Sequence, residues 1–304
     1  MDLIDGPHDP PLPRRLEFDF ARPCPPDWMA GSLPYSCLLN AYSIVFPALE
    51  TIMVRHVARA ARRVPADTDL AAVRGFLQQE GSHAREHRRS MECISAQGFR
   101  VTRTHNLTHL LVRLTDALLH RVLRPLFGHG FAVAIFAAAE HWTASLAETS
   151  LRPSPWLASV GRLDQPEPPG DLSEMEVLFL WHVAEELEHK TVVADLFDTL
   201  GGSQLSRVGG FLLATPVFLL LTAIGFASML AQSPRVLGPV EWRRIGRWRG
   251  LLRLVRTDLQ EIPGTYRATI RSYLRRGFHP SDHDTEALVG LAFLRLAQLR
   301  TEQA

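Results

Sequence analysis

The chain has 304 residues, of which 46% are hydrophobic and 21% are charged. These proportions are typical of a globular protein, and a chain of this length can bury a sizeable core. The formal net charge is only +1, so no strong overall field attracts polyanions and we expect no nucleic-acid partner. The three cysteines (Cys24, Cys37 and Cys93) have neither disulfide-framework nor CxxC spacing, which fits a reducing compartment.

Location in the cell is predicted from two segments. The N-terminus MDLIDGPHDPPLPRR has no basic stretch followed by an apolar one, so we predict no signal peptide and a cytoplasmic protein. Residues 208–234, however, carry no charge over 27 positions, which is long enough to cross a bilayer. An arginine- and tryptophan-rich segment follows, as expected beside a membrane. A helix buried in a large core, kinked at Pro216 and Gly225, is the alternative, so membrane association stays open.

The chain is predicted to be all-α. Residues 1–35 are rich in proline and are expected to form an extended N-terminal arm. The remainder, 36–304, is expected to be a single helical domain, because apolar residues recur at helical spacing and alternating strand patterns do not occur. The predicted helices cover 38–63, 70–97, 106–124, 130–149, 172–200, 207–231, 241–258, 263–275 and 284–302. Breaks are expected at VPADTD, AQGFRVTRTHN, LFGHG, residues 151–171 and LGGS.

Two predicted helices carry isolated acids among apolar residues. AYSIVFPALETIMV (41–54) holds Glu50, and FAVAIFAAAEHWTASLA (131–147) holds Glu140 in its middle. An acid in such a helix cannot reach water cheaply, so each one implies a buried partner.

Two further helices carry a glutamate and a histidine three residues apart. FLQQEGSHAREH (76–87) contains Glu80 and His83, and FLWHVAEELEHKTVVADLF (179–197) contains Glu186 and His189. On a helix each pair lies on one face, and apolar residues continue that face at both ends. Helical bundles that bind two metal ions use two such Glu-x-x-His helices plus one glutamate from each of two others. The order Glu, ExxH, Glu, ExxH therefore predicts a ferritin-like four-helix bundle over about 38–200, with additional C-terminal helices over about 207–302.

Three more histidines lie near these positions. His182 is one turn before Glu186 on the same face, so it is either an additional metal ligand or a hydrogen-bond partner of one. His87, one turn beyond His83, has the same two alternatives. His141 is rotated about 100° from Glu140 and is expected to pack or to support a ligand. Glu185 and Glu188 are expected to point away, toward solvent or arginines.

Five blocks carry a family resemblance: VFPALETIMVR, FLQQEGSHAREH, AEHWTASLAE, WHVAEELEHKTVVADLF and YLRRGFHP. They resemble, in order over about residues 40–285, the bacterial family labelled predicted metal-dependent hydrolase, which implies a metal site. The family usually has a glycine before the first glutamate, where this chain has Leu49.

The spacing His182-xxx-Glu186-xx-His189 is also similar to that of di-iron N-oxygenases that oxidise arylamines. This resemblance implies a ligand set of Glu50, Glu80, His83, Glu140, His182, Glu186 and His189, with two iron ions as cofactors. Ligand type equally admits manganese in one or both positions.

The first expectation for function is an oxidoreductase that activates O2 and oxidises a small apolar or amine-bearing organic substrate, with an external electron donor. The alternative is a hydrolase with a dinuclear metal-activated water. The second alternative is a non-enzymatic iron-binding or membrane-associated module. A homodimer is compatible with the sequence.

Overall fold

The computed structural model describes residues 10–152 and 172–301, and these form helices joined by short loops without any strand. The all-α prediction is confirmed. The helices are α1 (Leu33–Ala61), α2 (Ala71–Ala96), α3 (Thr102–Leu118), the π-helical turn η1 (Leu119–Leu123), α4 (Arg124–Leu151), α5 (Glu174–Glu188), α6 (Val192–Thr199), α7 (Gln204–Ala231), α8 (Ser233–Arg244), α9 (Arg247–Asp258), α10 (Ile262–Leu274), the 3₁₀ turn η2 (Pro280–Asp282) and α11 (Glu286–Thr301).

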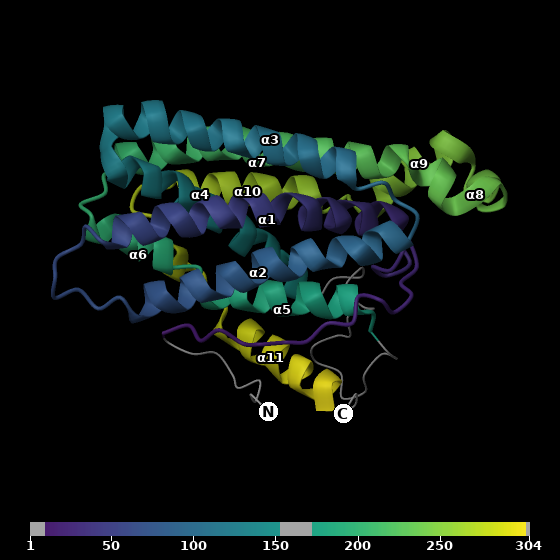
Figure 1. Ribbon diagram of the computed structural model, residues 1–304, viewed down its shortest axis with the longest axis horizontal. Helices are drawn as coiled ribbons and strands as arrows, with labels where there is room; N and C mark the ends of the chain where they lie inside the picture. The colour runs from purple at the N-terminus through teal and green to yellow at the C-terminus, as the bar shows by residue number, and fades with distance from the viewer. Residues whose placement is uncertain (1–9, 153–171, 302–304) are drawn as a thin grey trace.

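The four helices that carry the predicted metal-binding acids pack against one another, as Figure 1 shows. α1 packs on α2 and α4, and α5 packs on α2 and α4. Helix starts follow local capping: the Ser32 hydroxyl accepts from the amide of Tyr35 at the start of α1, and Ser173 with Glu176 forms a capping box at α5. This arrangement is consistent with the predicted four-helix bundle. α7 covers α1 and α4 on one side, and α11 covers α5 on the other.

Two apolar clusters form the core, and members of both contact the predicted site: Trp181 packs on His83, and Phe76 packs on His189. One includes Trp142, Leu178 and Trp181, and the other includes Phe76 and Phe136. Because these side chains are almost fully buried, any polar group held between them is removed from water.

Two of the predicted helices are each interrupted in the structure. The predicted helix 172–200 is wrong in its continuity: α5 ends at Glu188, His189 leaves helical geometry with φ −102° and ψ 6°, and α6 begins at Val192. The predicted helix 241–258 is two helices, separated at Gly246 with φ +87°, where a glycine is strongly favoured. The break predicted at LFGHG is confirmed by φ +84° at Gly128. The predicted break over 151–171 lies almost wholly outside the described residues.

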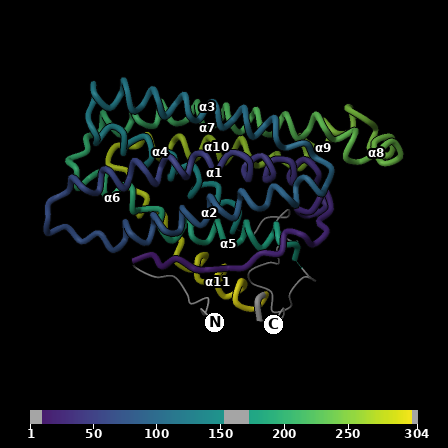
Figure 2. Tube along the Cα trace, viewed as in Figure 1, coloured from purple at the N-terminus to yellow at the C-terminus, as the bar shows by residue number. Residues whose placement is uncertain are grey.

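The described part of the N-terminal segment before α1, residues 10–32, contains no helix or strand, and it packs against the core. From Arg14 onward it runs between α5 and α11, which is clearest in the chain trace of Figure 2. Phe18 packs against Trp181 in a tilted arrangement with 5.7 Å between ring centroids, and Trp28 stacks on Phe179 at the same separation. The arm therefore covers the α5 side of the bundle.

α7 contains the uncharged stretch that left membrane association open. Its inner face approaches α1 and α4 closely: a Cβ on Gly225 would lie 2.9 Å from the Cβ of Ala41, and one on Gly210 would lie 2.6 Å from the carbonyl carbon of Ala134. Gly225 therefore serves close helix packing, and the helix runs on through Pro216 and Gly225. α1, the segment from α3 to α4 (Thr102–Leu151, kinked at Gly128) and α7 are each long and apolar enough to cross a membrane, and their most apolar windows are 83%, 33% and 39% buried.

Candidate metal centre

The seven residues predicted as ligands converge in the interior of the bundle. Their carboxylate and imidazole atoms form three mutually close groups, with all atoms of a group within 4.8 Å of one another. The groups are Glu80, Glu140 and His189; Glu80, His83 and Glu186; and Glu50, His83 and His182. Because Glu80 and His83 each belong to two groups, the three groups join into one continuous cluster. All seven side chains are buried, with at most 5% of their surface exposed.

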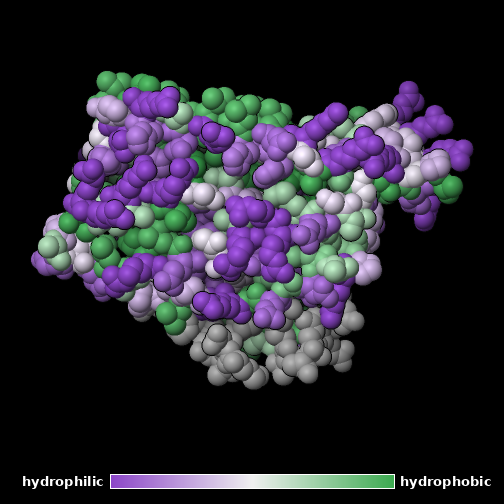
Figure 3. All heavy atoms as spheres, in the orientation of Figure 1, coloured by the Kyte–Doolittle hydropathy of each residue, from purple (hydrophilic) through white to green (hydrophobic). Residues whose placement is uncertain are grey.

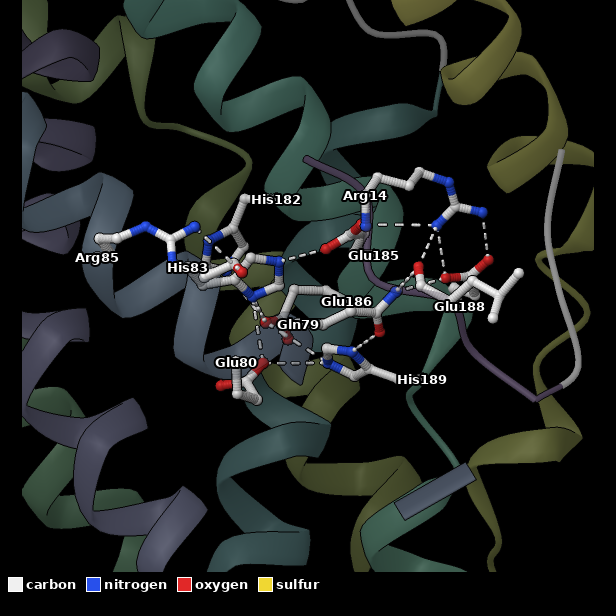
Figure 4. Close-up of polar contacts among 12 residues, drawn as sticks. Arg14, Gln79, Glu80, His83, Arg85, His182, Glu185, Glu186, Glu188 and His189 are labelled. Atoms are coloured by element: carbon white, nitrogen blue, oxygen red, sulfur yellow. Dashed lines mark hydrogen bonds and ion pairs between the residues drawn. The ribbon is translucent and has the colours of Figure 1, made fainter. Parts of the chain in front are cut away.

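The side chains approach the cluster from four helices, and Figure 4 shows several of them pointing toward one another. His83 Nδ1 lies 3.2 Å from Glu80 Oε1 on α2, and His182 Nε2 lies 3.0 Å from Glu186 Oε1 on α5. The end of α5 turns His189 inward, so that its Nε2 lies 3.4 Å from Glu80 Oε1 and 3.3 Å from Glu140 Oε2. The break in the predicted helix 172–200 thus occurs at a residue of the cluster.

The acids of this cluster are short of hydrogen-bond partners. One oxygen each of Glu50, Glu80 and Glu186, and both oxygens of Glu140, are buried without a hydrogen bond within the described residues. Burial and the charge of Glu186 raise the pKa of Glu140 to about 8, although His189 opposes the shift. Burial and the charge of Glu80 likewise hold the pKa of Glu50 well above its usual range. Buried acids in such numbers are costly unless cations neutralise them.

Two histidines are oriented by hydrogen bonds on the ring nitrogen that faces away from the cluster. His83 Nε2 lies 3.0 Å from Glu185 Oε2, and His189 Nδ1 lies 2.9 Å from Gln79 Oε1. If these nitrogens donate, His83 Nδ1 and His189 Nε2 are left as lone-pair donors facing the acids. Metal-binding histidines show this pattern almost universally, because the outer hydrogen bond selects the tautomer.

His182 is oriented in the same way through another histidine. Its Nδ1 lies 2.7 Å from His87 Nε2, and His87 Nδ1 lies 3.0 Å from Ser43 Oγ. If each ring carries its proton on Nδ1, His182 donates to His87 Nε2 and His87 donates to Ser43 Oγ. His182 Nε2 then faces Glu186. Of the two alternatives for His87, the structure supports hydrogen bonding to a ligand rather than direct ligation.

An arginine from the N-terminal segment ties this network down. Arg14 forms a two-pronged ion pair with Glu188, at 2.8 and 2.7 Å, and its backbone amide donates to Glu185 Oε1 at 3.3 Å. Gln79 Nε2 also donates to Glu188, at 2.6 Å. The expectation that these two acids meet solvent or arginines is confirmed in its second form, because Glu185 Oε1 also lies 3.5 Å from Arg14 Nη1. The expectation that Glu185 points away from the cluster is wrong, because the side chain is fully buried and contacts His83.

Sequence reasoning missed Gln79, Glu185, Ser43 and Arg14 as members of the site. Gln79 and Glu185 each directly precede a predicted ligand, and this adjacency is the only sequence signal for them. No sequence signal pointed to Arg14, because its role depends on where the N-terminal segment packs.

His141 does not contact the cluster. Its Nε2 lies 3.0 Å from the carbonyl oxygen of Thr269 and 3.1 Å from Ser272 Oγ, both on α10. Burial lowers its pKa to about 4, so the ring is neutral and anchors α10 to α4. Of the two roles expected for His141, packing is the one the contacts support.

An apolar cavity of about 140 Å³ adjoins the cluster between α1, α3, α4 and α7. Its inner end is formed by Glu50, Glu80, Glu140 and Glu186, and its walls are mostly leucine, phenylalanine and other apolar side chains, Leu49 among them. An apolar cavity of similar volume holds a benzene molecule in another protein. An organic group could therefore lie directly against the acids.

The fold and the buried cluster define this protein as a helical bundle with a carboxylate–histidine site suited to metal ions. A family model described as "Predicted metal-dependent hydrolase" matches residues 12–284. The chain belongs to this family, which confirms the resemblance seen in the five sequence blocks. Comparisons with curated proteins and with solved structures find no match.

Proposed function

We propose that the protein is a metal-dependent enzyme in which the cluster holds two divalent ions next to an apolar substrate cavity. The observation that carries the proposal is the set of five carboxylate oxygens, from Glu50, Glu80, Glu140 and Glu186, that are buried without a hydrogen bond to any part of the chain that the structure describes. Four glutamates balance the charge of two divalent ions, and the oriented histidines supply neutral nitrogen donors.

The grouping of the donors suggests how two ions would be held. Glu80, Glu140 and His189 would hold one ion and Glu50, His83 and His182 the other, and Glu186 lies in a third close group with Glu80 and His83. When bound, the ions would supply Lewis acidity, and redox chemistry too if they are iron or manganese. The chain's own residues contribute orientation: Glu185, Gln79 and His87 fix the three imidazoles, and the aromatic core keeps bulk water away.

Hydrolysis is the reaction that the family description supports, and it was the alternative expectation from sequence. In that case the cavity would bind the apolar part of the substrate and place a scissile bond at the glutamates. This reading is supported better by the comparisons than the O2-dependent oxidation expected first.

One observation favours oxidation as a second candidate. Six of the seven proposed ligands lie within helices, His189 directly follows one, and the adjoining cavity is lined mainly by apolar side chains, whereas hydrolytic dinuclear sites are usually open to water. An oxidation would require iron, with manganese as the variant, together with O2 and an electron donor. Neither candidate depends on the oligomeric state, and a homodimer remains a prediction.

Metal content tests the centre itself. Elemental analysis of the full chain is expected to give two ions per protein, and Glu140→Gln and Glu186→Gln are expected to lower that number. Glu148→Gln is the matched control, because Glu148 lies on the same helix as Glu140 but pairs with Arg152. The proposal would be overturned if Glu140→Gln and Glu186→Gln bound as much metal as the Glu148→Gln control.

Two assays distinguish hydrolysis, in which water reacts, from oxidation, in which O2 reacts. Turnover of an apolar ester under argon by the zinc- or manganese-loaded protein supports hydrolysis. A new visible absorbance when the anaerobic iron-loaded protein meets O2 supports oxidation. A metal-loaded protein that shows neither result would be assigned to the non-enzymatic alternative, iron binding.

A further inference from the structure

α3, η1 and α7 share an exposed apolar surface that the proposed reaction does not explain. On α3, Leu107, Leu110, Leu114 and Leu118 recur at spacings of three and four, and each is between 46% and 58% exposed. On α7, Leu205, Leu212, Leu213 and Leu220 are between 42% and 83% exposed. The two helices lie side by side, and Figure 3 shows hydrophobic residues gathered along this edge. Contiguous apolar surface of this kind marks an interaction site.

The cavity beside the metal cluster reaches the surface at this face. Leu118 from α3 and Leu213 from α7 line the cavity and are 51% and 42% exposed. Leu119 and Leu123 of η1 line the same part of the cavity. An apolar molecule lying against the face therefore has a short, mostly apolar route to the acids, along a lining to which Thr115, Asp116 and Thr143 also contribute.

Basic side chains border the face on the side of α1, and tryptophans lie beyond the end of α7. A hollow of about 590 Å³ between α1 and α3 is lined by five arginines and three histidines but only one acid, Asp116. Arg113 and Arg121 of this hollow flank the α3 leucines. Beyond the end of α7, α8 and α9 project from the bundle (Figures 1 and 2) and carry Trp242 and Trp248, whose rings pack edge to face at 5.0 Å. Tryptophan and arginine are the residues enriched where protein meets lipid head groups.

We propose that this face docks on an anionic lipid bilayer, with the leucines in the acyl boundary, and that the cavity takes a lipid-soluble substrate from the bilayer between Leu118 and Leu213. Docking on the surface fits better than crossing it, because the inner sides of α3 and α7 pack in the protein and α3 also carries Arg103 and Arg113. A bilayer fits better than a second copy of the chain, because a second copy would bring the same arginines to the interface. The docking does not depend on which reaction the metal centre performs, or on whether metal is bound.

Vesicle flotation of the full chain tests the docking. Binding is expected to vesicles of equal phosphatidylglycerol and phosphatidylcholine and to be at least about tenfold weaker for Leu114→Gln with Leu220→Gln, since each leucine contributes apolar burial. The control is Leu291→Gln with Leu294→Gln on α11, at the opposite side of the bundle, which removes leucines that are 38% and 57% exposed. Circular dichroism checks that both variants fold.

Two further experiments test the contribution of the arginines to binding and the contact of the cavity entrance with the bilayer. Arg113→Gln with Arg121→Gln is expected to reduce the preference for anionic over neutral vesicles, because each arginine near the surface adds about 1 kcal/mol, or about fivefold. Lipids brominated on the acyl chains are expected to quench the added fluorescence of Leu213→Trp but not that of Leu294→Trp.

Three results would overturn the proposal. One is no binding of the wild type to anionic vesicles, and another is equal binding by the two leucine double variants. The third is sedimentation of the wild type as a dimer that Leu114→Gln with Leu220→Gln converts to monomer, because a second copy would then cover the face. Vesicle binding needs no metal, so it can fail or succeed independently of the metal content measured above.

Discussion

Glu140→Gln should change stability in opposite directions without and with metal. In the folded metal-free protein, burial and the charge of Glu186 raise the pKa of Glu140 from 4.5 to about 8. The unfolded chain releases this proton at the lower pH, so the free energy of unfolding falls as pH rises from about 4.5 to about 8. One pKa unit corresponds to about 1.4 kcal/mol. The difference between the folded and unfolded pKa of Glu140 therefore costs at most about 5 kcal/mol of the free energy of unfolding.

The glutamine variant removes that cost, because an amide does not ionise. His189 keeps Glu80 and Glu186 within 3.4 and 3.7 Å as remaining partners. Metal-free Glu140→Gln is therefore expected to be more stable than the wild type at about pH 8, by a few kcal/mol within that limit, and nearly equal to it at about pH 4.5. With metal added, the order should reverse, because binding to the folded state stabilises it and the variant has lost a ligand.

Urea unfolding followed by circular dichroism measures both effects, in chelator and then in excess metal. Glu148→Gln, on the same helix, should show no reversal. The reasoning would be refuted if metal-free Glu140→Gln were less stable than the wild type at about pH 8, since Glu140 would then make structural interactions that the glutamine cannot replace.

Three further predictions follow from the surroundings of the site. Glu185→Gln should retain the fold but weaken metal binding by about 10- to 100-fold, because Glu185 orients His83 from outside the cluster; unchanged affinity in a metal titration would exclude that role. Ala139→Phe should fill part of the apolar cavity, leaving metal content unchanged and abolishing turnover of bulky substrates, so full activity would mean that the substrate lies elsewhere. Gly210→Ala should lower the thermal midpoint at a cost of about 1–3 kcal/mol, because its Cβ would meet the Ala134 backbone at 2.6 Å, whereas Gly264→Ala, which meets nothing within 4 Å, is the control.

The sequence was enough to predict the all-α class, most of the helices and, with the family resemblances, the seven residues that meet in the cluster. Helical spacing places Glu80 with His83, and Glu186 with His189, on single faces whatever surrounds them. Isolated acids such as Glu50 imply buried partners, because an apolar helix cannot offer water to them. These are local properties, which is why they could be read without knowing how the helices pack.

Only the tertiary structure decided what completes the site. Arg14 and Glu188 are 174 residues apart, and their pairing follows from the packing of the N-terminal segment along α5. The turn at His189 likewise has no glycine or proline to mark it, and the imidazole meets Glu80 and Glu140 only because α5 ends there. Helix packing also decided which face of α7 is buried and which is exposed. Spacing along one helix is set by backbone geometry, whereas contacts between segments depend on how the whole chain packs, and that difference separates what could be predicted from what could not.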